Sequence, residues 1–326
     1  MHEPLDQTDR DICAALLRNG RASWRRIAHA TGLQERTVSR RATRLFEQGL
    51  VRVTAFAHPL LTGRGDAYLM RIPCAPEHLD RVARWLAHRP ETLWVTTLMT
   101  GSAVLAECFV RNADRATLIS ELSAQPIRDF SFIQTHRYWR TVRGWQPGIL
   151  GEEQLAELGE DESFALRASE GLKELHDPLD LRIIELLEQD GRLSFEAISA
   201  EVGVAKATVR KRLQLMQHDD RVSIRAVLDP AILGFPHEAF VTASAPINMI
   251  DALADRLADS PYARWVAGTE TYGTVHALLA CRDRNQLSEV LEAVARAFAT
   301  ATLTVEPLLA MHKRSDVILP PALDPA

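Results

Sequence analysis

The N-terminal part of the chain alternates between helical hydrophobic patterns and short polar breaks. Apolar side chains recur every three or four residues in three stretches, which predicts three helices, over 9–18, 24–28 and about 35–48. Ser23 is a suitable N-cap for the second helix, and Gly32 permits a tight turn before the third. Gly49 and the following residues Leu50 to Val53 predict a helix stop and a strand, so we expect a winged helix-turn-helix domain.

The same pattern returns 171 residues later. Residues 9–63 match residues 180–234 without a gap, and glycines, prolines and apolar positions stay in register. A looser match continues further on, for example from Trp94 to Trp265. We therefore predict two copies of one unit. Residues 142–175 lie between the copies and include an acidic, Ala-, Leu- and Glu-rich run, where we expect a linker with one solvated helix.

The second half of each unit has the pattern of a ferredoxin-like β-α-β-β-α-β sandwich. In the first copy these elements are expected over 66–73, 76–88, 93–98, 104–110, 114–124 and 127–138. In the second copy they are expected over 239–243, 249–258, 264–269, 275–281, 284–298 and 303–311. We thus predict an α+β protein in which two winged helix-turn-helix domains (1–55 and 176–227) alternate with two ferredoxin-like sandwich domains (64–141 and 236–314).

The charge distribution indicates where this acidic chain would bind a polyanion. The net charge is −5, yet residues 18–53 contain nine arginines against two glutamates, a local net charge of +7. Residues 192–225 contain seven Lys or Arg against four acidic residues, a local net charge of +3. Both basic segments coincide with the predicted helix-turn-helix domains, which favours contact with DNA phosphates.

The third helix of the first head has one apolar face and one basic face. At 100° per residue, Val38, Ala42 and Leu45 lie within about 60° of one another and define the buried stripe. Arg36 and Arg40 then point the opposite way. Arginine binds guanine with two hydrogen bonds and also binds phosphates, so this face suits the major groove. The alternative is a solvated basic surface.

The candidate DNA-binding residues carry Arg, Lys, Ser or Thr side chains on the predicted third helices or at the N-cap of the second helices. They are Ser23, Arg36, Thr37, Ser39, Arg40, Thr43, Arg44, Ser194, Lys206, Thr208, Arg210 and Lys211. Arg41 lies near the buried edge, and we expect it to be structural. The second head has Ala207 and Leu215 at the positions of Arg36 and Arg44, so we expect weaker or differently specific DNA binding from it.

A helix-turn-helix head, a strand connector and a β-α-β-β-α-β module together resemble the Lrp/AsnC family of bacterial regulators. The opening of the second unit, Asp180 to Ser194 (DLRIIELLEQDGRLS), is similar to the family pattern. The resemblance implies a transcriptional regulator that binds double-stranded DNA. It also implies that sandwich domains pair, so that this chain forms a dimer-like unit by itself and a homodimer or larger assembly with further copies.

The resemblance also implies an amino acid or a related small molecule as effector. In that family a glycine-centred hairpin lies near the effector pocket, and it corresponds here to Thr100, Gly101, Ser102, Thr271, Tyr272 and Gly273. The alternative is a structural turn without a ligand.

Enzymatic function finds little support in the sequence. The chain contains no G-x-S-x-G, H-E-x-x-H, Walker or G-x-G-x-x-G motif, and we expect a non-enzyme without metal or cofactor. Siroheme decarboxylases are the main alternative, because they share the duplicated architecture. Their histidine-containing segment would fall near 95–99 or 266–271, and neither stretch contains histidine. A protein-interaction scaffold is a third class.

The remaining features are those of a cytoplasmic protein. The four cysteines are far apart, which fits neither a zinc site nor a disulfide framework. The acidic N-terminus lacks the pattern of a signal peptide, and no run of 18 apolar residues predicts a membrane span. We therefore expect cytoplasmic localisation and no membrane partner.

Overall fold

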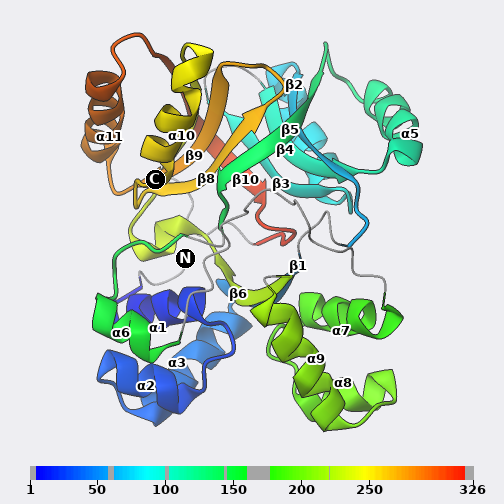
Figure 1. The fold of residues 1–326 in the computed structure, drawn as a ribbon, viewed down its shortest axis with the longest axis vertical. Coiled ribbons are helices and arrows are strands. Elements are labelled where there is room, and N and C mark those ends of the chain that lie inside the picture. Colours follow the sequence, from blue (N-terminus) through cyan, green and yellow to red (C-terminus); the bar gives the residue numbers. More distant parts are fainter. Residues whose placement is uncertain are drawn as a thin grey trace.

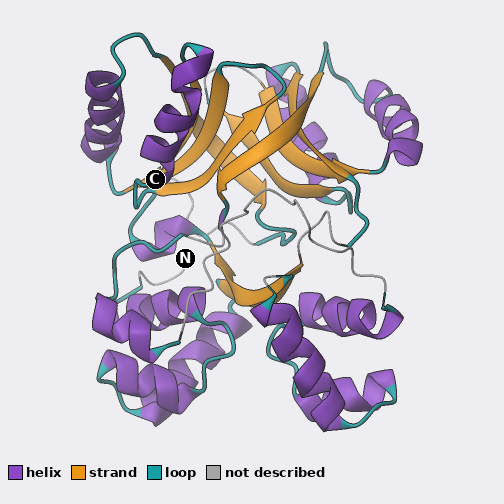
Figure 2. Ribbon diagram, viewed as in Figure 1, coloured by secondary structure: helices purple, strands orange, loops and turns teal. Residues whose placement is uncertain are grey.

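The computed structural model describes residues 5–57, 62–99, 103–142, 145–159, 177–219 and 221–319. Two helical heads lie side by side below one β-barrel that carries helices on its outside (Figures 1 and 2). Within the described ranges, no helix is long and apolar enough to cross a bilayer.

Each head is a three-helix unit, as the hydrophobic pattern predicts. The first head consists of α1 (Gln7–Arg18), α2 (Trp24–Thr31) and α3 (Glu35–Glu47), and the second of α7 (Pro178–Gln189), α8 (Phe195–Val202) and α9 (Lys206–His218). Ser23 caps α2 by accepting a hydrogen bond from the N–H of Arg26. The turn before α3 contains Gly32 at a φ of 69°, a left-handed conformation that favours glycine.

Both sandwich domains have the expected β-α-β-β-α-β order. The first contains β2 (Asp66–Pro73), α4 (Leu79–Ala87), β3 (Thr92–Leu98), β4 (Ala103–Val110), α5 (Asn112–Ser123) and β5 (Ser131–Arg140). The second contains β7 (His237–Ser244), α10 (Ile250–Ala258), β8 (Ala263–Thr269), β9 (Thr274–Cys281), α11 (Arg284–Ala297) and β10 (Thr302–Lys313). The α+β fold class with helix-turn-helix heads is therefore confirmed.

The two sandwich domains close into one barrel because the last strand of each copy pairs both within its own copy and with the other copy. The strand order is β10-β3-β4-β2-β5-β8-β9-β7, and neighbouring strands run antiparallel. Strand β5 of the first copy pairs with β8, and β10 of the second copy pairs with β3. Large apolar side chains from both copies, including Trp94, Leu105, Phe240 and Trp265, form one core inside the barrel. The sandwich domains thus pair within one chain, as the resemblance implies.

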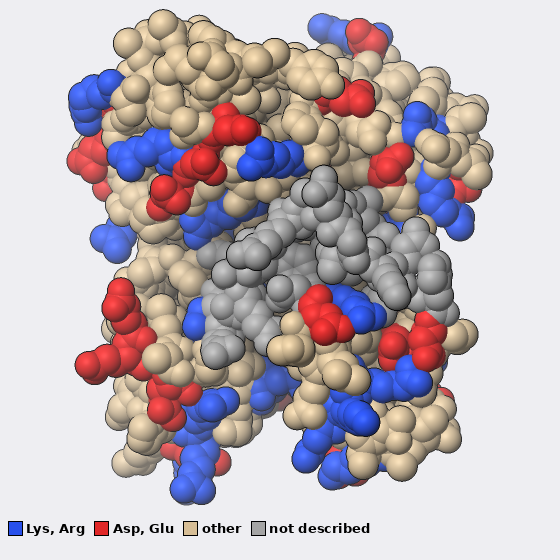
Figure 3. All heavy atoms as spheres, in the orientation of Figure 1, with Lys and Arg blue, Asp and Glu red and all other residues tan. Residues whose placement is uncertain are grey.

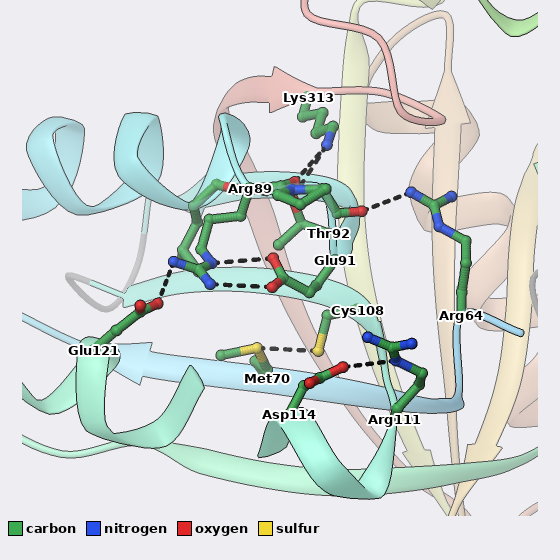
Figure 4. A network of polar contacts seen from close by, with 12 residues as sticks. Arg64, Met70, Arg89, Glu91, Thr92, Cys108, Arg111, Asp114, Glu121 and Lys313 are labelled. Carbon is green, nitrogen blue, oxygen red and sulfur yellow. Dashed lines mark hydrogen bonds and ion pairs between the residues drawn. The ribbon is translucent and has the colours of Figure 1, made fainter. Parts of the chain in front are cut away.

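Polar contacts fasten the end of the second copy to the first (Figure 4). The Nζ atom of Lys313, at the end of β10, donates a hydrogen bond to the carbonyl oxygen of Arg89 at 2.8 Å. The guanidinium of Arg89 in turn forms ion pairs with Glu91 and Glu121. Arg64 donates to the carbonyl oxygen of Pro90 at 2.6 Å. The Lys313 contact holds the turn between α4 and β3 against the closing strand of the barrel, and the other contacts fix that turn within the first copy.

The connections differ from the sequence-based expectations in two respects. The strands expected to begin separate wings, β1 (Val51–Ala57) and β6 (Val222–Leu228), pair with each other and join the two heads. The segment expected to be a linker with one solvated helix contains one helix within 145–159, largely exposed, but the segment is packed onto the first head, where Leu158 is fully buried. Its helix α6 (Glu152–Glu157) lies on α2, where Gln154 donates to the carbonyl oxygen of Ala30 at 3.0 Å. Residues 160–175 of that linker lie outside the described residues.

Candidate nucleic-acid interface

The two heads are related by an approximate twofold axis through the β1–β6 ribbon. In the antiparallel register, Val51 lies opposite Leu228 and Ala57 lies opposite Val222. The start of each strand thus pairs with the end of the equivalent strand in the other repeat. Thr54 and Arg225, which occupy equivalent positions in the two repeats, lie opposite each other at the centre. A duplicated sequence thus gives two heads with the isologous pairing that a homodimer would have.

Reciprocal arginine contacts reinforce this head-to-head pairing. Arg21 donates from Nη1 to the carbonyl oxygens of Gly191 and Leu193, at 2.7 and 3.0 Å. Its equivalent in the second repeat, Arg192, donates to the carbonyl oxygens of Gly20 and Ala22, at 2.5 and 3.2 Å. Burial lowers the pKa of both guanidinium groups. Each arginine thus holds the loop between the first two helices of the opposite head.

Aromatic contacts and glycines repeat the same symmetry. Arg21 lies over the ring of Phe195 at 4.8 Å, and Arg192 lies over the ring of Trp24 at 4.0 Å. A Cβ atom on Gly191 would lie 2.9 Å from the backbone of Val53 and Thr54, and a Cβ on Gly20 would be as close to Arg225 and Ile224. Only glycine therefore permits the loop of one head to approach the ribbon so closely.

The third helix of the first head, α3, exposes two arginines that are unpaired among the described residues. Val38, Ala42 and Leu45 are fully buried, as predicted. Arg36 and Arg40 are exposed, and neither forms a hydrogen bond or ion pair with any residue in the described part of the chain. Their guanidinium groups are free to bind an anion from solution.

The other basic side chains of α3 contact the head itself. Arg41 forms ion pairs with Asp6 at 2.6 Å and Asp9 at 3.1 Å, which fits the structural role expected for it. Arg44 was expected on the DNA-binding face, but its guanidinium pairs with Asp9, a buried carboxylate of α1. A hydrogen bond from the N–H of Asp9, together with Arg41, lowers the pKa of Asp6. These pairs fix α3 on α1.

The third helix of the second head, α9, has a different surface. Lys206 pairs with Glu196, and the hydrogen bond from Lys206 lowers the pKa of that carboxyl. Arg210 lies 5.3 Å from the ring centre of Phe195, while Lys211 is exposed. Leu215, at the position of Arg44, is 51% exposed. Arg212 repeats the structural role of Arg41, because it pairs with Asp177 and Asp180.

The hydroxyl candidates lie on or beside these helices. Thr43 and Thr208 are exposed, whereas Thr37 and Ser39 are half-buried. Ser23 and Ser194 are exposed N-caps whose side chains accept hydrogen bonds from the N–H groups of Arg26 and Ala197. Lys and Arg side chains gather at the ends of both heads that point away from the barrel (Figure 3).

The candidate effector residues of the second copy lie on a turn of the sandwich domain and not on a head. Tyr272 is 76% exposed in the turn between β8 and β9, and its ring centre lies 6.2 Å from that of His136. Thr271 is exposed, and Gly273 has a φ of 80°. The first-copy turn, Thr100 to Ser102, lies outside the described residues.

The inter-head contacts were missed by sequence reasoning, although a signal was present. The Gly-Arg pair that closes each first helix is identical in both repeats, as Gly20-Arg21 and Gly191-Arg192. Repetition of an arginine in a loop indicates a shared contact, but the partner of that contact lies in the other repeat and is visible only in the folded chain.

Comparison with known proteins identifies the heads. A family model of the AsnC-type helix-turn-helix domain matches residues 5–45 and again residues 177–224. The HTH-type transcriptional regulator FL11 of Pyrococcus horikoshii is 27% identical over 110 residues, which are 33% of this chain and 72% of that protein. The proline dehydrogenase transcriptional activator of Rhizobium radiobacter is 40% identical over 65 residues, which are 20% of this chain and 42% of that protein.

Two solved structures of one enzyme each match almost the whole chain. The siroheme decarboxylase NirDL superposes with a TM-score of 0.60, covering 96% of this chain and 94% of that chain at 12% sequence identity. At this identity the match shows a common duplicated fold and no more. The family-model matches fall on the helix-turn-helix heads, and the two curated relatives are named as transcriptional regulators. Each of the two repeats of this chain therefore contains an AsnC-type helix-turn-helix head.

Proposed function

We propose that this protein is a sequence-specific DNA-binding transcriptional regulator whose two heads bind one DNA duplex. The observation that carries the proposal is the pair Arg36 and Arg40, unpaired and exposed on α3 among the described residues. The twofold relation of the heads supports it, because paired recognition helices can enter successive major grooves about 34 Å apart. The two matches to an AsnC-type domain agree with this arrangement.

A gel-shift titration with DNA from upstream of the protein's own gene tests the proposal. The variant Arg36→Ala/Arg40→Ala should bind this DNA more weakly, because removal of each base-specific arginine costs about 1–3 kcal/mol, or roughly 5- to 150-fold in affinity. The matched control Arg256→Ala/Arg284→Ala removes the same charge from exposed positions of α10 and α11. Equal affinity of the first variant and the control would refute the role of α3.

We further propose that the two heads prefer different bases. Where α3 presents Arg36 and Thr43, α9 presents Ala207 and Gln214. Arginine favours guanine, glutamine pairs with adenine, and a small apolar side chain contacts the methyl group of thymine. The operator should therefore be non-palindromic, with guanine under the first head and A·T pairs under the second. Selection of bound sequences from random DNA tests this, and recovery of a symmetric site would contradict it.

The second head should add phosphate contacts. Replacing Lys206, Arg210 and Lys211 together by alanine should flatten the slope of log affinity against log salt, by about 0.9 for each phosphate that is no longer neutralised. The protected DNA should also become shorter. An unchanged footprint and salt slope would mean that the second head does not touch DNA.

We also propose that an amino acid or a related small molecule modulates binding at the turns of the sandwich domains. The exposure of Tyr272 beside His136 supports this position. A panel of amino acids should include one that raises the thermal unfolding midpoint of the parent protein and not of Tyr272→Ala. If no compound in the panel changes the midpoint or the DNA affinity, the effector proposal fails.

The enzymatic alternative rests on the common fold with siroheme decarboxylase. A decarboxylase of that kind must bind a tetrapyrrole, so incubation with an iron tetrapyrrole would shift the absorbance bands of the ligand. We expect no shift beyond that seen with an unrelated protein. A saturable shift with loss of carbon dioxide would replace the regulator proposal by the enzyme.

A further inference from the structure

A small enclosed cavity lies where the first head, the β1–β6 ribbon and the barrel meet. Its volume is about 20 Å³, which suits one water molecule or one monatomic ion. The residues that line it come from different parts of the chain and include Leu17, Phe56, Trp145, Arg225, Arg264 and Ser315.

Arg225 is a buried cation without a carboxylate partner among the described residues. Its side chain is 4% exposed, and it donates from Nε to the carbonyl oxygen of Leu17 and from Nη2 to that of Trp145. Its Nη1 atom is buried and has no acceptor in the described part of the chain. Burial, with Arg18 and Arg140 nearby, lowers the pKa of Arg225 to about 9. A buried positive charge is unfavourable unless an anion neutralises it.

A second buried donor lines the same cavity. Arg264 pairs through Nη1 with Glu238 at 3.0 Å, but its buried Nε atom has no acceptor within the described ranges. The hydroxyl group of Ser315 is a further potential donor. A water molecule would need acceptors for its own two hydrogens, whereas an anion only accepts. Two unsatisfied guanidinium N–H groups at one cavity therefore favour an anion.

We propose that this cavity binds a monatomic anion of the halide class, in practice chloride, between Arg225 and Arg264. The site exists in one repeat only. The position equivalent to Arg225 is Thr54, whose hydroxyl donates at 2.8 Å to the carbonyl oxygen of Glu188, the counterpart of Leu17. In the second repeat Arg225 stands in place of this threonine, and its longer, charged side chain creates the anion site. Because the cavity joins α1 to the barrel, chloride stabilises the docking of the first head.

Thermal unfolding at constant ionic strength tests the proposal. The parent protein should unfold about 2–4 °C higher in sodium chloride or bromide than in sodium gluconate, at about 150 mM of each. Arg225→Thr, which introduces the residue of the first repeat, should unfold at the same temperature in all three salts. The control Arg256→Gln, on an exposed turn of α10, should keep the full halide response.

Chloride-35 NMR of the parent protein gives a readout that does not depend on a variant. The protein should broaden the chloride resonance, and added bromide should reverse the broadening by displacing chloride from the site. Arg264→Lys, which lacks Nε, should reduce the broadening. No halide response in the parent would overturn the proposal, because a water molecule or another part of the chain would then satisfy Arg225. A halide response that persists in Arg225→Thr would also overturn it, since the ion would bind elsewhere. Neither readout uses DNA, so the result is independent of the proposed function.

Discussion

Replacing Arg192 by alanine should loosen the two heads from each other. Arg192 donates two hydrogen bonds to carbonyl oxygens of the opposite head, at 2.5 and 3.2 Å, and lies 4.0 Å from the ring centre of Trp24. A hydrogen bond from a charged donor contributes about 1.5–3 kcal/mol, and a cation–π contact contributes about 0.5–1 kcal/mol. Part of this stabilisation is offset, because burial disfavours the charged form of the guanidinium and lowers the pKa of Arg192 to about 10. We expect a net destabilisation of about 2–4 kcal/mol.

Amide hydrogen exchange is the suitable assay, because it reports local opening of the head pairing separately from unfolding of the barrel. The N–H groups of Gly20 and Gly191 are the probes, since they donate across the interface to Ile224 at 3.0 Å and Val53 at 2.9 Å. A destabilisation of about 2–4 kcal/mol should speed their exchange by roughly 30- to 700-fold. Amides in β4 should keep their parental rates.

Arg182→Ala is the matched control, because Arg182 lies on the surface of α7 and pairs only with Glu185 one turn away at 2.9 Å among the described residues. Such exposed pairs contribute about 0.5 kcal/mol or less. If Arg192→Ala changed the exchange of Gly20 and Gly191 no more than this control, Arg192 would not stabilise the pairing of the heads. The β1–β6 ladder alone would then hold the heads together.

Three further outcomes are expected. Gly191→Ala should destabilise the protein by about 1–3 kcal/mol, because its Cβ would overlap the backbone at Thr54, whereas Gly151→Ala, with space around it, should change the thermal midpoint little. Burial raises the pKa of Glu107 from an unfolded value near 4.5 to about 7, so stability is lost as pH rises through this window. Glu188, with a pKa of about 7, adds to that loss. Glu107→Gln should therefore narrow the difference between thermal midpoints at about pH 5 and about pH 8, and an equal difference would contradict the burial argument. Light scattering at micromolar concentration should give a mass of at least twice 36.4 kDa, and a mass of one chain would exclude further association.

Local features of the fold follow from the sequence alone. The helices of the heads are predictable because apolar residues recur at helical spacing and because Ser23 and Gly32 mark a helix start and a turn through their own backbone chemistry. The repeat is visible without any structure, since residues 9–63 and 180–234 align without a gap. The order of strands and helices in each sandwich follows from the same local signals. Buried and exposed faces of α3 were likewise predictable from helical geometry.

Only the tertiary structure decided which elements contact one another. The residue pattern of β1 is that of a strand, but the alternation of its side chains does not specify which strand it pairs with. In the folded chain β1 pairs with β6 of the other repeat and does not form a wing. Helical angles put Arg44 on a flank of α3, but Asp9 on another helix draws its guanidinium away from the basic face. The acidic composition of the linker indicates a solvated segment, yet Leu158 is buried because the head offers an apolar surface close by. In each case the deciding contact joins residues far apart in the chain, and hydrophobic periodicity carries no information about which distant surface will meet it.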